Sequence, residues 1–365
     1  MIPQYRPLID RVSLAKEVGD YILSDGYFTE YKKTEEFEAA IAKAVGAQYC
    51  SVVNNGTISL SLALLASGLK PGDRVIIPNI TMIATCNAVK LLGMIPVLVD
   101  VDHNLCLDLA ATKATILTGS IKAIIYVTLN GRSHTSEEMV DLDRFCESNR
   151  VTIIEDNAQS LGSYRGLTTA ISCPPRGIGS FSFSMPKIIT TGQGGCLVTN
   201  VESLANKIRK LKDFGRTAAG IDIHDEFGIN SKFTEIQAII GLNQLTTLNQ
   251  RIVRKREIYN RYLSSLHSND EIAFISHHAD TTPWFIDIYT TRRDELQAYL
   301  KALKIGTRAI YPPLSSQQCN RDLRASRMPV SERYASFGLW LPSSLDLTND
   351  EIDFVCGNIR NFYGQ

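Results

Sequence analysis

The sequence lacks the features that mark proteins which bind nucleic acids or span membranes. Its 365 residues carry 38 basic and 38 acidic side chains, so no net charge attracts a nucleic acid or an anionic membrane surface. The longest apolar runs, such as VIIP and AIIYV, are far shorter than the roughly 20 residues of a transmembrane helix. We therefore expect a soluble protein whose partners are neither nucleic acids nor membranes.

Cysteine and histidine are present, but without the spacing of a disulfide framework or a metal site. The eight cysteines form no C-x-x-C pair and several lie in apolar runs, so we expect reduced residues of the core. The six histidines include the neighbours His277 and His278, yet none has metal-site spacing. Charges among the first ten residues and the lack of an apolar h-region argue against a secretory signal. These features predict a cytoplasmic protein without a metal.

A regular alternation of helix and strand patterns runs from about residue 34 to residue 200. Helix patterns cover residues 34–46, 57–69, 82–93 and 136–149. Strand patterns lie at residues 48–53, 71–78, 95–102, 121–129, 151–156, 179–184 and 195–200. Most of these strands are apolar on both faces and separated by helices, which predicts an α/β fold with a mostly parallel central sheet covered by helices.

The second half of the chain has a different pattern. Helices are expected at residues 200–215 and over one long stretch, 232–265. From about residue 271, short strands (283–290, 307–313) mix with helices (293–306, 348–363). We therefore divide the chain into a large α/β domain with an N-terminal arm, residues 1–250, and a smaller C-terminal α+β domain, residues 251–365.

Lys187 is the least ordinary candidate for a functional residue. It lies in FSFSMPKIITTGQGG, where apolar and small residues surround it and glycines let the backbone pass close to a bulky group. The alternative is a solvated loop lysine, as most lysines are. A buried lysine has a depressed pKa, and such lysines serve as Schiff-base nucleophiles.

Two other motifs lie where a strand ends. In NNGT, residues 54–57, Gly56 and Thr57 begin a helix, and its N–H groups and the threonine hydroxyl suit a phosphate. Ordinary helix capping is the alternative. Asp156 ends a buried strand, where open α/β sheets bind ligands, and the alternative is an N-cap for a following helix. Together with Lys187 these are the parts that a pyridoxal phosphate enzyme needs: a phosphate turn, a carboxylate for the ring nitrogen and a lysine for the imine.

With these motifs in order, the chain resembles the DegT/DnrJ/EryC1/StrS family of nucleotide-sugar aminotransferases, which are fold-type I pyridoxal phosphate enzymes. The resemblance covers nearly the whole chain. It is carried by FEAAIAKAVGAQYCSVVNNGTISLSLALLASGLKPGDRVIIP, TMIATCNAVKLLGMIPVLVDVD, IIEDNAQSLG, SFSFSMPKIITTGQGGCLVTN, INSKFTEIQAIIGLNQL, GTRAIYPPL and GLWLPSSLDLTNDEIDFVCGNI.

The resemblance implies catalytic roles for two residues. Lys187 corresponds to the lysine that holds pyridoxal 5'-phosphate and shuttles protons, and Asp156 to the partner of the pyridinium nitrogen. Gln159 corresponds to a residue near the phenolic oxygen of the ring. Arg308 and Tyr311 fall in the stretch that borders the sugar nucleotide in relatives.

The resemblance also implies how the phosphate is held. Gly56 and Thr57 match the phosphate loop, joined by Ser182. Asn230 corresponds to an asparagine that reaches the phosphate from the neighbouring subunit, which implies a homodimer with shared active sites.

Some positions depart from the pattern of the family. Met82 stands where relatives have an aromatic residue stacked on the ring, and its polarisable sulfur can also cover an aromatic face. Gln193 replaces a glutamate, Ser315 stands where a histidine is common, and VTLNGRSHT lacks the histidine and tyrosine of the usual stretch.

The resemblance implies a ping-pong transamination in which glutamate donates its amino group to C4 of a nucleoside-diphosphate 4-keto-6-deoxyhexose. TRAIYPPL and PWFIDI favour the type that forms perosamine or viosamine, for glycans or lipopolysaccharide O-antigen. A C3-aminating relative and a non-catalytic cofactor-binding regulator are the alternatives. Lys187 argues against the branch of dehydratases, which have histidine at this position.

Overall fold

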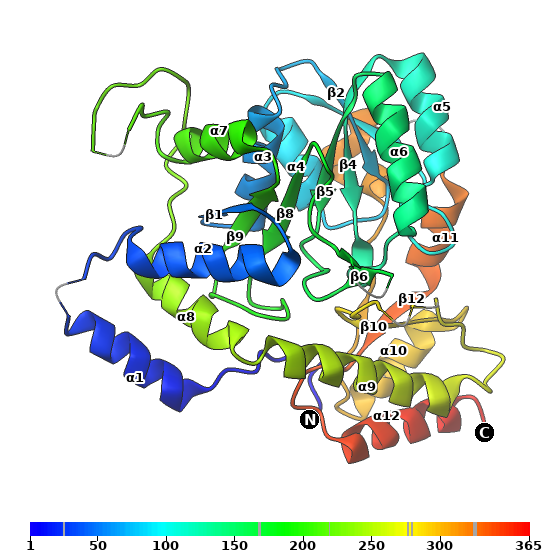
Figure 1. Ribbon diagram of the computed structural model, residues 1–365. Coiled ribbons are helices and arrows are strands. Elements are labelled where there is room, and N and C mark those ends of the chain that lie inside the picture. The colour runs from blue at the N-terminus through cyan, green and yellow to red at the C-terminus, as the bar shows by residue number, and fades with distance from the viewer. Residues whose placement is uncertain (25, 167–168, 219, 276, 279, 324–326) are drawn as a thin grey trace.

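A seven-stranded sheet in the order β1-β9-β8-β5-β4-β2-β3 lies at the centre of the larger part of the molecule (Figure 1). The computed structural model describes residues 1–24, 26–166, 169–218, 220–275, 277–278, 280–323 and 327–365. In the sheet, β9 is antiparallel to both of its neighbours, whereas β3, β2, β4, β5 and β8 pair in parallel. The expected mostly parallel α/β sheet is confirmed. Its strands are β1 (Tyr49–Val53), β2 (Arg74–Pro78), β3 (Ile95–Val99), β4 (Ile121–Val127), β5 (Thr152–Asp156), β8 (Ile178–Ser182) and β9 (Gly195–Thr199).

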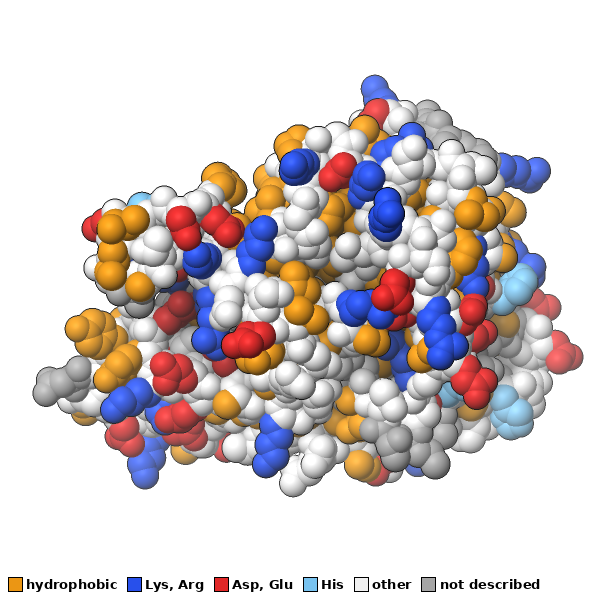
Figure 2. Space-filling model, turned by 45° about the horizontal axis from the view of Figure 1, so that its top comes forward, with side chains coloured by type: hydrophobic (Ala, Val, Ile, Leu, Met, Phe, Trp, Pro, Cys, Tyr) orange, Lys and Arg blue, Asp and Glu red, His pale blue; other side chains and the backbone are white. Residues whose placement is uncertain are grey.

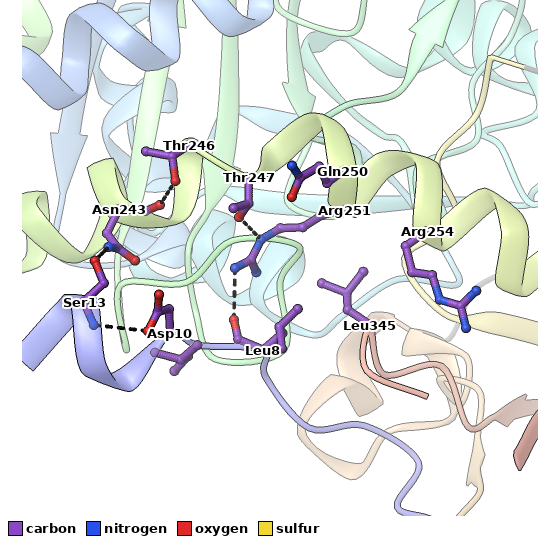
Figure 3. A pocket seen from close by; sticks show the side chains of 11 residues that line it. Leu8, Asp10, Ser13, Asn243, Thr246, Thr247, Gln250, Arg251, Arg254 and Leu345 are labelled. Carbon is purple, nitrogen blue, oxygen red and sulfur yellow. Dashed lines mark hydrogen bonds between the residues drawn. The ribbon is translucent and has the colours of Figure 1, made fainter. Parts of the chain in front are cut away.

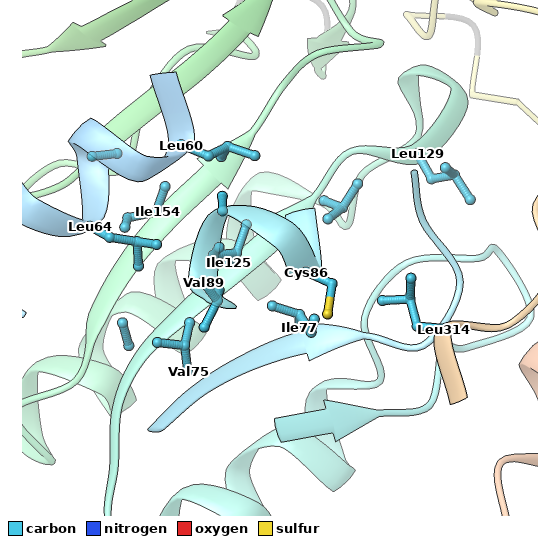
Figure 4. Close-up of a cluster of buried hydrophobic side chains, with 14 of the residues drawn as sticks. Leu60, Leu64, Val75, Ile77, Cys86, Val89, Ile125, Leu129, Ile154 and Leu314 are labelled. Atoms are coloured by element: carbon cyan, nitrogen blue, oxygen red, sulfur yellow. The ribbon is translucent and has the colours of Figure 1, made fainter. Parts of the chain in front are cut away.

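Helices cover both faces of this sheet because alternate strand residues point to opposite sides. Ile125 of β4 packs with helices α3, α4 and α7 in one apolar cluster, part of which Figure 4 shows. Its neighbour Ile124 packs on the opposite face with α5 and α6, and α2 and α8 cover that face over β1, β8 and β9. These helices are α2 (Lys32–Val45), α3 (Gly56–Ala66), α4 (Ala84–Leu91), α5 (Leu109–Gly119), α6 (Ser136–Ser148), α7 (Glu202–Lys212) and α8 (Glu235–Leu245).

The long helix expected over residues 232–265 is wrong, because the chain forms two helices there. Helix α8 ends at Leu245 and α9 (Leu248–Leu266) begins after a break at Thr246 and Thr247. The hydroxyl groups of these two threonines donate to backbone carbonyls three residues earlier. Such local bonds from a threonine compete with the regular hydrogen bonding of a helix.

A second, three-stranded sheet in the order β10-β12-β11 lies in the C-terminal part. With helices α9, α10 and α12 it encloses its own apolar core, which agrees with the expected α+β pattern. The division near residue 250 stays a prediction, and residue 250 falls inside α9. The elements here are β10 (Ile286–Tyr289), α10 (Arg293–Ala302), β11 (Arg308–Ala309), η2 (Leu314–Ser316), η3 (Gln318–Leu323), α11 (Pro329–Phe337), β12 (Gly338–Leu341) and α12 (Asn349–Phe362).

The N-terminal helix α1 (Arg11–Ile22) lies against α8, and none of its residues is buried. The remaining short elements are η1 (Leu129–Gly131), β6 (Tyr164–Arg165) and β7 (Thr169–Ala170). Among the described helices, none is long and apolar enough to cross a membrane. Cys319 is exposed on η3, so the expectation that the cysteines belong to the core is wrong for this residue.

Candidate active site

Lys187 lies on the turn that joins β8 to β9, and the backbone of this turn is held by side chains from three distant segments. Three consecutive carbonyl groups each accept one hydrogen bond from such a side chain. The bonds run from Trp284 Nε1 to Pro186 O (2.7 Å), from Tyr5 Oη to Lys187 O (3.1 Å) and from Arg251 Nη1 to Ile188 O (3.1 Å). The position of Lys187 is therefore fixed by the N-terminal segment, α9 and the residues before β10.

The amino group of Lys187 lies in a partly closed environment. Its Nζ is 4.3 Å from the centroid of the Trp284 ring. Burial lowers the pKa of Lys187 from 10.5 to about 8; the charge of Asp156 opposes this shift and that of Arg308 adds to it. A lysine with this pKa has a substantial neutral fraction near physiological pH, as a Schiff-base nucleophile requires.

Asp156 ends β5 and is buried. Its carboxylate accepts hydrogen bonds from Thr85 Oγ1 (2.8 Å) and from Ala158 N (3.2 Å). A turn follows it and not a helix, so the helix N-cap alternative for Asp156 is wrong. Burial raises its pKa above the ordinary value, whereas the bond from Thr85 and the charge of Lys187 lower it. A buried carboxylate at the carboxyl end of a parallel strand suits a protonated ring nitrogen.

Gln159 lies in that turn, and a hydrogen bond to its amide oxygen fixes the orientation of its side-chain amide. The backbone N–H of Asn130 donates to Gln159 Oε1 at 2.7 Å, and Gln159 Nε2 donates to the hydroxyl of Tyr311 at 3.3 Å. Asn130 has a left-handed φ of 55°, and its side chain bonds to both backbone groups of Phe285. The amide N–H₂ of Gln159 thus points towards Tyr311. The family resemblance implies that Tyr311 lies in the stretch bordering the sugar nucleotide.

The turn before α3 contains the helix cap that was one of the two interpretations of NNGT, and it also has N–H donors that a phosphate would need. Asn55 caps the helix, since its side chain accepts from Ile58 N at 2.9 Å. Within the described part of the chain, the N–H groups of Gly56 and Thr57 have no protein acceptor, as the first N–H groups of a helix require another partner. A Cβ on Gly56 would lie 2.9 Å from Ser182 Cβ, so only glycine allows this close approach of α3 to β8. The donors of the turn and the Ser182 hydroxyl therefore lie together.

The other residues predicted from sequence lie around this centre or apart from it. Met82 is 45% exposed, three residues before the Thr85 that bonds Asp156. The Arg308 guanidinium lies over the rings of Tyr311 (5.8 Å) and Trp340 (5.3 Å). Asn230 is exposed, at the end of the segment that follows α7.

Two of the departures from the family pattern have a structural account. The side chain of Gln193 is exposed, and its backbone carbonyl accepts from Gln237 Nε2. In VTLNGRSHT, the buried Arg132 forms two hydrogen bonds to Asp287 of β10, of 2.7 and 2.9 Å. Burial opposes the charge of Asp287, but Arg132 lowers its pKa well below the ordinary range. This stretch thus ties the turn after β4 to the second sheet.

A small pocket brings together Gln159, Ser182, Lys187 and Trp284. A larger pocket of about 410 Å³ lies elsewhere, between the N-terminal segment and helices α8 and α9 (Figure 3). It contains none of the site residues predicted from sequence, and its polar groups largely bond one another, as Arg251 does with Thr247 and Leu8 O. The smaller pocket is therefore the candidate active site.

Comparison with known proteins identifies the family. Residues 12–360 match the model of the DegT/DnrJ/EryC1/StrS aminotransferase family. The chain belongs to this family. It is 33% identical to GDP-perosamine synthase of Escherichia coli O157:H7 over 99% of this chain and 98% of that protein. It is 32% identical to UDP-2-acetamido-2-deoxy-3-oxo-D-glucuronate aminotransferase of Pseudomonas aeruginosa PAO1, over 93% of each. The crystal structure of S. venezuelae DesV in complex with a ketimine intermediate superposes with a TM-score of 0.90 at 29% identity, covering 97% of this chain and 95% of that one.

As a member of this family, the protein is a pyridoxal phosphate-dependent aminotransferase acting on nucleotide sugars. The described residues fit the cofactor. The free N–H groups and the glycine-only approach at Gly56 suit its phosphate, the buried Asp156 its ring nitrogen, and Lys187 its aldehyde. When bound, the cofactor supplies an electron sink for charge that develops on the substrate carbon.

Sequence reasoning missed the residues that support this centre. Thr85 was only part of a helix pattern, Trp284 only part of a strand pattern, and Tyr5 lay in the arm. One signal was available for Trp284, since the sequence has only two tryptophans. Both lie against site residues: Trp284 against Lys187, and Trp340 against Arg308 and Tyr311.

Proposed function

We propose that the protein transfers the amino group of glutamate to C4 of a 4-keto-6-deoxyhexose carried on a nucleoside diphosphate, as in perosamine or viosamine formation for glycans or O-antigen. The observation that carries the proposal is the grouping of Lys187, Gln159 and Ser182 in one pocket. The charge of Asp156 acts on Lys187, and the donor turn at Gly56 packs against Ser182. The identity to GDP-perosamine synthase over nearly the full length supports the choice of C4. We place this activity in the cytoplasm, whose reducing conditions keep cysteines free, as they are here.

Each residue has a proposed task. Lys187, when neutral, takes a proton from the substrate carbon and returns it on the cofactor side. Asp156 keeps a proton on the ring nitrogen, and Gln159 donates to the phenolic oxygen. Gly56, Thr57 and Ser182 hold the phosphate. Among the other proposed contacts, Met82 covers the ring, Asn230 of a second subunit completes the phosphate site, and Arg308 and Tyr311 contact the sugar nucleotide.

We propose a homodimer because two apolar regions are exposed on one side of the molecule. Figure 2 shows orange side chains at its left edge, over the segment after α7 and near the connection of α1 to α2. A patch of this kind supports burial against a protein partner. The large side chains exposed there are Leu23, Tyr27, Phe28, Ile221, Ile223 and Phe227.

The test is an absorbance spectrum of the purified holoenzyme with and without glutamate. The visible band of the lysine-bound cofactor is expected to disappear as glutamate converts the cofactor to its pyridoxamine form, and Lys187→Ala is expected to lack both the band and the conversion. A Lys187→Ala protein that still converts would overturn the assignment of Lys187.

The second candidate is amination at C3, favoured by the identity to the Pseudomonas 3-oxo sugar aminotransferase. Pyridoxamine-form enzyme should consume a 4-keto nucleotide sugar and leave a 3-keto sugar unreacted. The reverse preference would establish the C3 alternative.

A further inference from the structure

We propose that Trp284 is the positioning residue of Lys187: its indole face holds the free ε-ammonium group, and its indole N–H holds the backbone that carries the lysine. The proposal rests on the role proposed for Lys187. The Nζ of Lys187 lies 4.3 Å from the ring centroid, and Nε1 of Trp284 donates to Pro186 O at 2.7 Å. One side chain thus contacts the main chain at Pro186, one residue before the lysine, and the amino group of the lysine itself.

Trp284 is itself immobilised. It is 5% exposed, stacks on Phe285 with ring centroids 3.8 Å apart and meets Trp340 edge-on at 5.7 Å. Its backbone carbonyl accepts a hydrogen bond of 2.8 Å from the buried Lys255 of α9. The ring therefore offers Lys187 a fixed face.

The two charges near Lys187 shift its pKa in opposite directions, and the Trp284 ring adds its own effect. Among the described residues, Asp156 of β5 and Arg308 of β11 are the charged groups that shift its pKa, in opposite directions. Tyr5 donates a hydrogen bond to the backbone carbonyl of Lys187, and Lys255 donates to the backbone carbonyl of Trp284. The negative face of an aromatic ring attracts a cation and has no equal attraction for a neutral amine. Trp284 therefore joins Asp156 in favouring the ammonium form against burial.

This preference has a chemical consequence. Covalent capture joins Nζ of neutral Lys187 to the aldehyde carbon of pyridoxal phosphate and releases one water molecule, so it needs the nitrogen lone pair. While Lys187 is not bonded to the cofactor, the ring holds its ammonium at one place and lowers its neutral fraction. Removal of the ring should free the lone pair at a lower pH.

The experiment uses cofactor-free protein and added pyridoxal 5'-phosphate. The rate of covalent capture is followed by absorbance from pH 6 to pH 10, and borohydride reduction with peptide mass analysis locates the label. In Trp284→Leu and Trp284→Met, which lack a ring, the midpoint of the profile should fall by about one pH unit, which is about tenfold in rate below the midpoint. Trp284→Phe keeps a ring face and loses the N–H, so its midpoint should stay near that of the parent while its rate changes at every pH.

A purely structural role would change the rate equally at every pH in all three variants. Unchanged midpoints in folded Leu and Met variants, with the label on Lys187, would overturn the Trp284 proposal alone. Label uptake by Lys187→Ala at the parental rate would overturn the proposed role of Lys187, and this proposal with it.

Discussion

The amino group of Lys187 is influenced by two opposite charges, which make its ionisation testable by single substitutions. Asp156 raises and Arg308 lowers its pKa. Asp156→Asn should therefore lower the Lys187 pKa below about 8, and Arg308→Met should raise it, each by about one unit. Capture of pyridoxal phosphate needs the neutral amine, so the midpoint of its pH–rate profile should lie lower in cofactor-free Asp156→Asn than in the parent, and higher in Arg308→Met. The midpoints of the two pH–rate profiles measure these shifts.

A matched control separates charge from packing in this prediction. Arg308→Lys keeps the positive charge on β11, so its midpoint should stay close to that of the parent. If the midpoints of Asp156→Asn and Arg308→Met shifted in the same direction, a change in burial would dominate, which would contradict the electrostatic explanation.

At the residue scale, the sequence points to the groups proposed to carry the chemistry but not to the side chains that hold them in place. Lys187 and Asp156 stand out because a lysine among small residues and a carboxylate at a strand end are locally unusual. Trp284 and Tyr5 cannot be found in this way, because their contacts with the Lys187 turn join segments about a hundred or more residues apart. Such contacts depend on tertiary packing, which local patterns do not encode.

At the element scale, helix α2 depends on α8 for its N-terminal cap. The N-cap residue Tyr31 makes no side-chain cap bond. Instead the carboxylate of the buried Glu235 accepts from the N–H groups of Tyr31 (2.8 Å), Lys33 (2.7 Å) and Thr34 (2.8 Å). Glu235→Gln removes the charge at similar shape and should lower the free energy of unfolding by about 1–3 kcal/mol at pH 7. Urea unfolding at fixed protein concentration measures the loss.

The pH dependence of this cap has a defined sign. Burial alone would raise the pKa of Glu235, but the hydrogen bonds from Thr34, Lys33 and Tyr31 lower it below 4.5. An acid whose pKa is lower in the folded than in the unfolded protein stabilises the fold. This stabilisation is fully present above the unfolded pKa and is lost as the pH falls through the folded pKa. The free energies of unfolding of the parent and of Glu235→Gln should therefore converge in acid.

Substitution of the exposed Glu36 on the same helix, Glu36→Gln, is the control and should change the free energy of unfolding by less than about 0.5 kcal/mol. Equal stabilities of the parent and Glu235→Gln at pH 7 would contradict the cap.

The elements that sequence patterns do not predict have weak or interrupted local patterns. Helix α5 has threonines in several turns and a solvent-exposed Leu117, so it lacks a clear apolar stripe. The break between α8 and α9 falls at two threonines inside a pattern that otherwise continues. Strand β12 is a short apolar run, GLWL, which becomes a strand by pairing with both β10 and β11. Tertiary pairing thus decides the structure of β12, whereas the break between α8 and α9 goes with the local hydrogen bonds of the two threonines.

At the scale of the whole molecule, the order of the strands was not predictable. Strand β9 lies between β1 and β8 and is antiparallel to both, although its sequence is as apolar as that of the parallel strands. This arrangement makes the Lys187 turn a connection between adjacent antiparallel strands, β8 and β9. The lysine thereby reaches the same edge of the sheet as Asp156, since β8 pairs in parallel with β5.

A shared active site makes a prediction that only the assembled molecule can test. If Asn230 completes the phosphate site of a second subunit, Lys187→Ala and Asn230→Ala damage the same site from different chains, and each variant alone should have little activity. Refolding equal amounts together should form mixed dimers as about half of the population, each with one intact site, so about a quarter of the parental activity should return. Mass determination by light scattering checks that the species is a dimer, and a mixture of Lys187→Ala with Asp156→Asn, two residues of one chain's site, is the control. That control should regain nothing, because every site formed in it keeps one of the two defects. Recovery in the control, or none in the test mixture, would contradict a site that is completed by Asn230 of the partner subunit.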